Sequence, residues 1–242
     1  MMLRMLRRCA AIAGVLLACT GVRAQVVDQS YTPTPANGGT LVNSSFEGRP
    51  IWLAQSFTAG LSGQLTGVDL AIWRDADAPQ SLVLQVFEIN GLTLGASLGS
   101  MPIALAAIAV GVEGSWVPLP GSDPLATHVS LADLHIAVQS GLTYALAVSA
   151  LDPTAGAPFD LPIVWIGNLQ NPKTVDDPYP GGRWSYTYAA ALAPGDGLFP
   201  TPPLEDLGFR TFVSTVPDAP TAGLALAGLA LVLARRRSTA AR

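Results

Sequence analysis

Cysteines and charged residues are scarce in this chain of 242 residues: it has two cysteines, and only 12% of its residues are Asp, Glu, Lys or Arg. Its low net charge of −4, together with 50% hydrophobic residues, argues against intrinsic disorder. The few basic residues also provide no surface for nucleic acid. We therefore expect a folded chain with one sizeable domain or two small ones.

Positive charge is scarcest in the body of the chain, residues 25–214. That segment has five basic residues against sixteen acidic ones, a balance of −11, whereas the other eight basic residues lie in the first 24 and the last eight positions. An acidic body is expected to attract neither DNA nor anionic lipid. The five basic residues are Arg49, Arg74, Lys173, Arg183 and Arg210.

Residues 1–24 have the three parts of a secretory signal peptide. A cationic start precedes the uncharged run Cys9 to Cys19, and small residues follow at Val22 and Ala24. The run is shorter than the ~20 residues that a membrane-spanning helix needs. We expect export through the Sec machinery and cleavage after Ala24, which would remove both cysteines. One alternative stays open, because Leu16-Leu17-Ala18-Cys19 resembles a lipoprotein signal in which Cys19 would be acylated.

Residues 215–242 carry a second sorting pattern. The segment Val216-Pro217-Asp218-Ala219-Pro220 precedes the uncharged run Thr221 to Ala234, and Arg235, Arg236 and Arg237 follow. As a helix the run would be about 21 Å long, which is short of the ~30 Å hydrocarbon core. The arginines would stay on the cytoplasmic side and leave the body outside. We expect a transient contact of residues 221–234 with the inner membrane; a short tail anchor and a buried helix are the alternatives.

This order of elements resembles the PEP-CTERM sorting signal of Gram-negative bacteria that make exopolysaccharide. The resemblance implies that an exosortase in the inner membrane recognises the motif and that the protein is processed and moved to the cell surface or exterior. The sorting residues would be Val216, Pro217, Asp218 and Pro220, with the cluster Arg235, Arg236 and Arg237. Asp218 replaces the family's Glu and one residue is inserted, so the sorting enzyme that accepts this variant stays open.

The body has the pattern of an all-β domain. Gly and Pro account for 38 of the residues from Gln25 to Val213, well above the average of about 12%, and they separate short alternating runs. In Leu142 to Leu151 every second residue from Tyr144 is expected inside, and Ala145, Ala147 and Ser149 are expected outside. Only Met101 to Val110 looks helical, with a connector as the alternative. The expected strands are 52–58, 68–73, 81–90, 115–119, 135–139, 142–151, 161–166, 184–190 and 208–213.

Nine strands at this spacing predict an antiparallel β-sandwich of jelly-roll type. Three stretches also resemble the "choice-of-anchor" ectodomains, which are β-sandwiches joined to interchangeable surface anchors in bacteria. They are Gln55 to Val68, Ser140 to Ala145 and Asp206 to Val213. That resemblance implies a sandwich and surface display, and it brings no activity with it.

Residues with catalytic potential are few, and each has a plain structural explanation. Gly95-Ala96-Ser97-Leu98-Gly99 has the spacing of a nucleophile elbow, but Pro102 leaves no room for the helix that should follow. The two histidines, His128 and His135, cannot fill a zinc site alone. Asp75 with Asp77, and Asp176 with Asp177, leave bound calcium open as the one cofactor, without the ordered spacing of a calcium loop. We therefore expect no catalytic residues.

Aromatic residues make the better candidate for a binding site. Trp165, Tyr179, Trp184, Tyr186 and Tyr188 fall within 24 residues, around a loop that contains Arg183. Flat rings beside polar groups suit a sugar, although the alternation of Trp184, Tyr186 and Tyr188 also fits packing on a core. Tyr179, in the Pro and Gly-rich loop, is the residue we expect to be most exposed.

Two functions from different classes follow from these patterns. The first is an exported, non-enzymatic surface or matrix protein whose sandwich binds glycan or exopolysaccharide through Tyr179, Trp184, Tyr186 and Trp165. The second is a secreted carbohydrate-active hydrolase or lyase on the same scaffold, which would need two carboxylates about 5–10 Å apart. An enzyme requires a concave acidic pocket, whereas a binding module requires exposed rings.

Overall fold

The computed structural model describes residues 25–33, 38–78, 80–112, 118, 121–151, 163–167, 179–200 and 206–215. Within it, Val26–Ser214 forms one compact unit. The predicted signal peptide, the sorting motif at Val216 to Pro220 and the cluster at Arg235 to Arg237 lie outside the described residues. So do Asp176 and Asp177.

The fold is all-β, as expected, with several antiparallel sheets. The larger sheet has the order β15-β14-β4-β12-β7-β8, with β3 beside β4. Its strands are β3 (Ser45–Phe46), β4 (Arg49–Thr58), β7 (Leu82–Asn90), β8 (Thr93–Ile103), β12 (Thr143–Ala150), β14 (Trp184–Tyr188) and β15 (Phe199–Pro200).

A smaller sheet has the order β1-β16-β5-β10, with β11 also paired to β5. It consists of β1 (Gln25–Tyr31), β5 (Gly63–Leu70), β10 (Thr127–Ser130), β11 (Ile136–Val138) and β16 (Phe209–Ser214). Ala71 joins β5 to a third sheet, of order β2-β13-β6-β9, in which β6 and β9 run parallel. Its strands are β2 (Gly39–Leu41), β6 (Ile72–Arg74), β9 (Ala109–Val110) and β13 (Ile163–Ile166).

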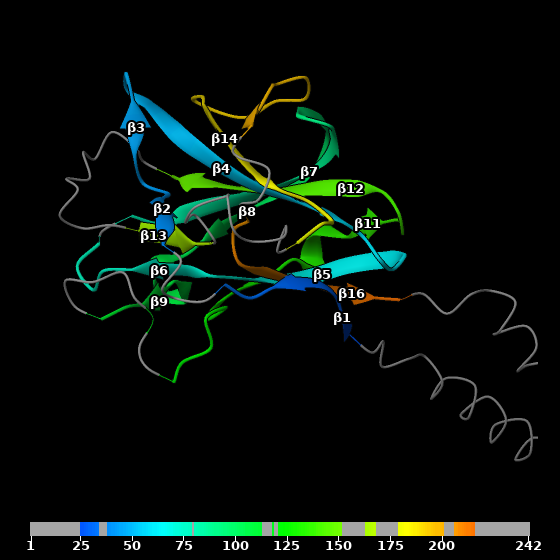
Figure 1. Ribbon diagram of the computed structural model, residues 1–242, viewed down its shortest axis with the longest axis horizontal. Coiled ribbons are helices and arrows are strands. Elements are labelled where there is room, and N and C mark those ends of the chain that lie inside the picture. Colours follow the sequence, from blue (N-terminus) through cyan, green and yellow to red (C-terminus); the bar gives the residue numbers. More distant parts are fainter. Residues whose placement is uncertain are drawn as a thin grey trace, which may run out of the picture. The chain divides into compact units, whose positions relative to one another are not determined.

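The main core lies between the two larger sheets. In Figure 1, β5 and β16 cross below β4, β12 and β7, and the rings of Phe57 on β4 and Phe209 on β16 are 6.1 Å apart. Tyr144, Leu146 and Val148 on β12 face this core, as their alternation predicts. Burial of each large apolar side chain stabilises the fold by roughly 1.5–3 kcal/mol.

A second core covers the outer face of the larger sheet. Ala145 and Ala147 were expected on an exposed face, but both are fully buried there beside Leu192 and Leu198. The reason is that the segment after β14 folds back over the sheet, where the Leu198 amide donates to the Leu92 carbonyl at 2.8 Å. The expected exposure of this face is therefore wrong, and the larger sheet is apolar on both sides.

The expected helix at Met101 to Val110 is also wrong, and the connector alternative is correct. Met101–Ile103 completes β8, and a single 3-10 turn (η2, Leu105–Ala107) leads into β9. A second 3-10 turn, η3, spans Ala132–Leu134. Ser97 lies within β8 rather than on an elbow or a hairpin turn. Gly99, two residues later, leaves room for the Leu134 side chain, since a Cβ at this position would lie only 3.0 Å from it.

Candidate functional site

Three of the four predicted binding residues are buried, and two of them, Trp165 and Tyr179, lie well inside the protein. Trp165 on β13 is fully buried, and its Nε1 donates to the Gly208 carbonyl at 2.8 Å. Tyr179 was expected to be the most exposed ring, but it is only 7% exposed. Its hydroxyl donates to Gln29 Oε1 at 3.0 Å, and its ring meets Phe209 edge-on at 5.1 Å. Neither ring is placed to meet a ligand, because each packs against the core instead.

The other two predicted residues share one side of β14. Trp184 is buried at the margin of the main core and is only 9% exposed, and Tyr186 and Tyr188 are half-buried against that core. The ring centroids of Trp184 and Tyr186 are 6.1 Å apart, and those of Tyr186 and Tyr188 are 5.8 Å apart. The spacing of every second residue along a strand produces this series. It places the three rings in a continuous line.

Two exposed phenylalanines adjoin that line, Phe46 at its Tyr188 end and Phe199 beside its middle ring, Tyr186, and the sequence analysis missed both. Phe46 on β3 is 57% exposed with its ring 5.5 Å from Tyr188, and Phe199 on β15 is 55% exposed with its ring 5.6 Å from Tyr186. Phe46 is distant from β14 in sequence, and Phe199 belongs to the next strand along the chain; strand pairing brings both to the row. The sequence signal that could have indicated an exposed Phe46 is Glu47-Gly48, because these two residues form the hairpin turn that follows Phe46. We call Phe46, Trp184, Tyr186, Tyr188 and Phe199 the aromatic row.

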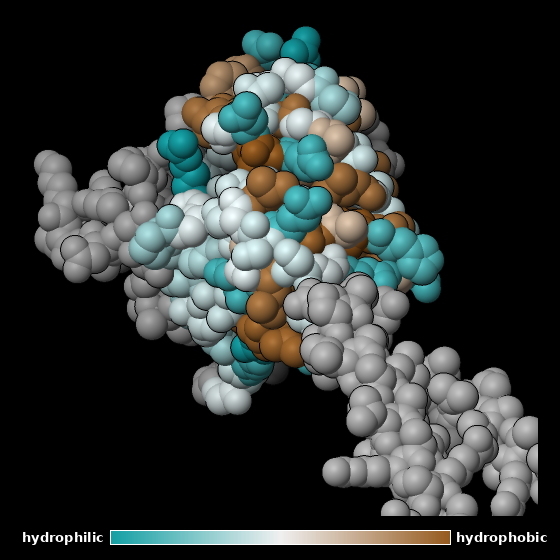
Figure 2. Space-filling model, turned by 90° about the vertical axis from the view of Figure 1, so that its right-hand side faces the viewer, coloured by the Kyte–Doolittle hydropathy of each residue, from teal (hydrophilic) through white to brown (hydrophobic). Residues whose placement is uncertain are grey.

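The register of the larger sheet fixes where the aromatic row lies. Tyr186 pairs with Leu53 and Tyr188 with Ile51 on β4, so the row continues the core-facing side of the sheet to its margin. Ring pairs at these separations attract one another beyond the burial of their area. The row thus gathers five aromatic rings, two of them largely exposed, at the margin of the sheet. On the face shown in Figure 2, by comparison, hydrophobic and hydrophilic residues are interspersed.

The histidine and acidic residues form a separate ionic group on the smaller sheet. His128 Nδ1 lies 2.6 Å from Asp69 Oδ1, and Arg210 pairs with Asp69 at 3.1 Å and with Asp123 at 3.6 Å. Asp69 occupies β5, between β10 and β16, so cross-strand neighbours supply both partners. Ser97 belongs to the larger sheet, and the structure does not bring it to His128, whose contacts are Asp69 and Phe212.

The candidate calcium ligands that the structure describes form a turn. Asp75 Oδ1 accepts a hydrogen bond from the Asp77 amide at 3.1 Å, which is a local Asx turn. Among the described residues, no three His, Cys, Asp or Glu side chains gather as a metal site would require. No helix in the described ranges has the length and hydropathy to cross a bilayer.

The chain was compared with known proteins, and neither a protein family nor a curated protein matches it. No residue role is therefore carried over from a relative.

Proposed function

We propose that this chain is an exported, non-enzymatic protein of the cell surface or extracellular matrix, whose jelly-roll β-sandwich binds glycan through the aromatic row. The proposal of export and sorting is supported by the signal-peptide pattern of residues 1–24 and by the PEP-CTERM-like pattern around Pro217, Asp218 and Pro220. Exosortase, the Sec machinery and exopolysaccharide are the proposed partners.

The observation that carries the binding proposal is the position of Tyr186. Its ring has aromatic neighbours at 6.1, 5.8 and 5.6 Å, and the outermost rings of the row, Phe46 and Phe199, are each more than half exposed. A sugar has an apolar C–H face that stacks on such rings and hydroxyls that bond to phenol groups. Tyr and Trp supply large contact area at little cost in side-chain entropy, which favours them in binding sites.

The direct test is glycan binding by the exported chain, purified after processing by its host. Replacing both outer rings (F46S with F199S) should weaken binding at least tenfold without unfolding the protein, because both side chains are largely exposed. Phe212 provides the matched control, since it is a half-buried ring outside the row. Absence of retention on any polysaccharide would overturn glycan binding, and equal loss in F212S would overturn the role of the row.

A further inference from the structure

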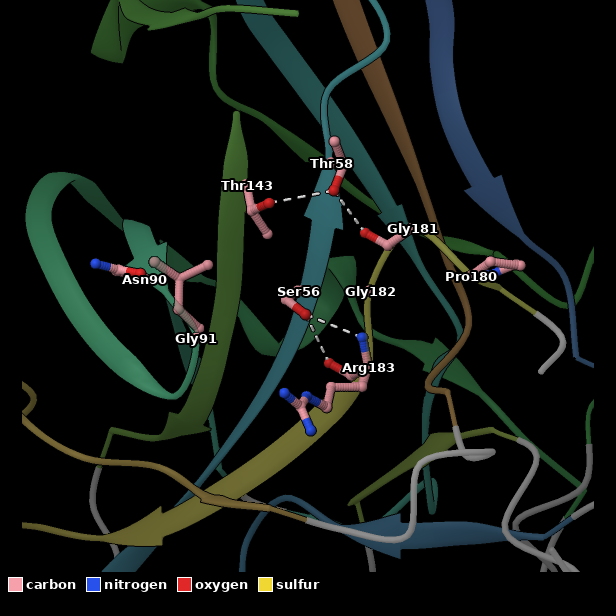
Figure 3. A pocket seen from close by; sticks show the side chains of 10 residues that line it. Ser56, Thr58, Asn90, Gly91, Thr143, Pro180, Gly181, Gly182 and Arg183 are labelled. Carbon is pink, nitrogen blue, oxygen red and sulfur yellow. Dashed lines mark hydrogen bonds between the residues drawn. The ribbon is translucent and has the colours of Figure 1, made fainter. Parts of the chain in front are cut away.

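A polar groove lies on the outer face of the larger sheet, beside the second core. Its volume is about 380 Å³, and Figure 3 shows it between the ends of β4 and β12, the β7–β8 turn and the segment that leads into β14. Its lining includes Ser56, Thr58, Thr143, Asn90, Gly182 and Arg183. This volume falls at the low end of the ~300–1,000 Å³ found for small-molecule sites.

The wall formed by Gly181, Gly182 and Arg183 is held rigidly against β4. A Cβ on Gly182 would lie 1.9 Å from the Ser56 carbonyl oxygen, so only glycine permits this approach. Ser56 N donates to the Arg183 carbonyl at 2.9 Å, and Arg183 N donates to Ser56 Oγ at 2.9 Å. The groove is therefore formed before any ligand arrives, which lowers the entropy lost on binding.

The hydroxyl protons of Ser56, Thr58 and Thr143 in the groove already form hydrogen bonds within the protein. Ser56 Oγ donates to the Arg183 carbonyl at 3.0 Å, and Thr58 Oγ1 donates to the Gly181 carbonyl at 2.9 Å. Because a hydroxyl has one proton, Thr143 must be the donor in its 3.2 Å contact with Thr58. Thr143 Oγ1 keeps its lone pairs. It can therefore accept a hydrogen bond from a ligand but has no proton left to donate.

Arg183 supplies the positive charge of the groove. Arg74 and Arg210 are engaged elsewhere, since Arg74 donates to three backbone carbonyls and Arg210 pairs with Asp69 and Asp123. Arg49, at the start of β4, does not line the groove. No ion pair of Arg183 occurs among the described residues, and no acidic side chain lines the groove. In Figure 3 the Arg183 side chain extends from the segment just before β14 toward β12. A half-buried guanidinium with no acidic partner, in an acidic body, is suited to an anionic ligand.

We propose that this groove binds a carboxylate-bearing sugar unit, a hexuronate, with Arg183 pairing to the carboxylate and Thr143 accepting a hydrogen bond from a sugar hydroxyl. One guanidinium matches one negative charge and the planar geometry of a carboxylate. A phosphate group would be better served by several cations or by a helix N-terminus, neither of which lines the groove. Thr143 needs a hydrogen-bond donor on the ligand, which a sugar supplies and a simple anion does not.

This site is separate from the aromatic row. Ser56 and Thr58 point to the outer side of β4, whereas their neighbours Leu53 and Phe57 point to the main core, which the row continues. The two sites therefore lie on opposite faces of the larger sheet. Ligand binding can therefore be absent at one site and present at the other.

The experiment is calorimetric titration of the processed chain with methyl β-D-glucuronide, with methyl β-D-glucoside, acetate and sulfate as comparison ligands. We expect the glucuronide to bind at least tenfold more tightly than the other three. R183Q should abolish that preference, R183K should retain part of it, and T143V should weaken binding severalfold. R49Q is the charge-matched control, because Arg49 lies outside the groove, and it should bind as the unchanged protein does.

Each possible outcome decides the proposal. Equal binding of acetate or sulfate would show an anion site without sugar recognition, and unchanged binding by R183Q would remove the site from the groove. Equal loss in R49Q would reduce the effect to net charge. The variant F46S with F199S should keep full glucuronide affinity, so failure of the aromatic row is distinguished from failure of the groove. Circular dichroism of every variant separates lost binding from lost folding.

Discussion

Ser56 and Arg183 hold each other by three hydrogen bonds of 2.9, 2.9 and 3.0 Å, two of them through the Ser56 hydroxyl. This tie continues the β4–β14 pairing by one residue ahead of Trp184, the first residue of β14, and it holds one wall of the groove against β4. It is possible only because Gly182 has no side chain, since a Cβ would overlap the Ser56 carbonyl.

Gly182→Ala should therefore destabilise the protein by about 2–3 kcal/mol, as expected when atoms are forced into a filled space. Thermal and urea denaturation would measure the change. Gly197→Ala is the matched control, because Gly197 is exposed and a Cβ there meets nothing within 4 Å. The control should stay within about 0.5 kcal/mol of the original protein. Equal stability of the two variants would show that the segment moves away from β4 without cost.

Glu47→Asn should stabilise the β3–β4 hairpin. Glu47 and Gly48 have φ values of 53° and 74°, and both form the two-residue turn between Phe46 and Arg49. Positive φ at both positions is the mark of a type I′ turn, which favours Asn-Gly. We expect a gain of about 0.5–1 kcal/mol in the free energy of unfolding, measured by urea denaturation. A loss of stability would mean that Glu47 makes a contribution unrelated to its backbone conformation.

Alkaline pH should destabilise the protein through two tyrosines, the buried Tyr179 and the half-buried Tyr31. Burial raises the pKa of Tyr179 from its ordinary value of 10.0 to about 12, and the charges of Asp28 and Asp206 add to the effect. Burial and the charge of Asp206 raise the pKa of Tyr31 to about 12 as well. The unfolded chain then loses these protons first, so stability holds below pH 10 and falls between pH 10 and 12.

Tyr179→Phe provides the test of that pH dependence. At neutral pH the variant should lose about 0.5–1.5 kcal/mol, because the hydrogen bond to Gln29 disappears. Between pH 10 and 12 its stability should fall less steeply than that of the original protein, and the difference between the two should narrow. Denaturation curves at a series of pH values would show this directly. Parallel curves across that range would contradict the buried-phenol explanation.

Sorting can be tested on the full chain in a Gram-negative host that makes exopolysaccharide. If an exosortase reads the Pro-Asp-Ala-Pro segment, the protein should appear outside the cell without its terminal arginine cluster. Replacing Pro217 and Pro220 by Ala should leave it uncut in the inner-membrane fraction. Mass spectrometry of the recovered protein decides the outcome, since an intact C-terminus in the exported material would exclude processing.

The alternation of residues along a strand predicts burial correctly on the strand face that packs against the main core. The alternation of Tyr144, Leu146 and Val148 predicts their inward face correctly, because side-chain direction along a strand follows from backbone geometry alone. The same alternation fails for Ala145 and Ala147, because a segment more than forty residues later covers them. Alternation shows which residues share a face, but it cannot show what lies on the other one.

The amino-acid sequence by itself determined an all-β body, an acidic surface and the aromatic content of β14, since these depend on composition and on the period of a strand. Only the tertiary structure decided which rings are exposed and which are buried. It buried Tyr179 against Phe209 and added Phe46 and Phe199 to the row. It also placed Arg183 in a groove with hydroxyls from β4 and β12. The exposure of a side chain and its contacts depend on how strands pair in the folded protein. A short stretch of sequence does not show that pairing.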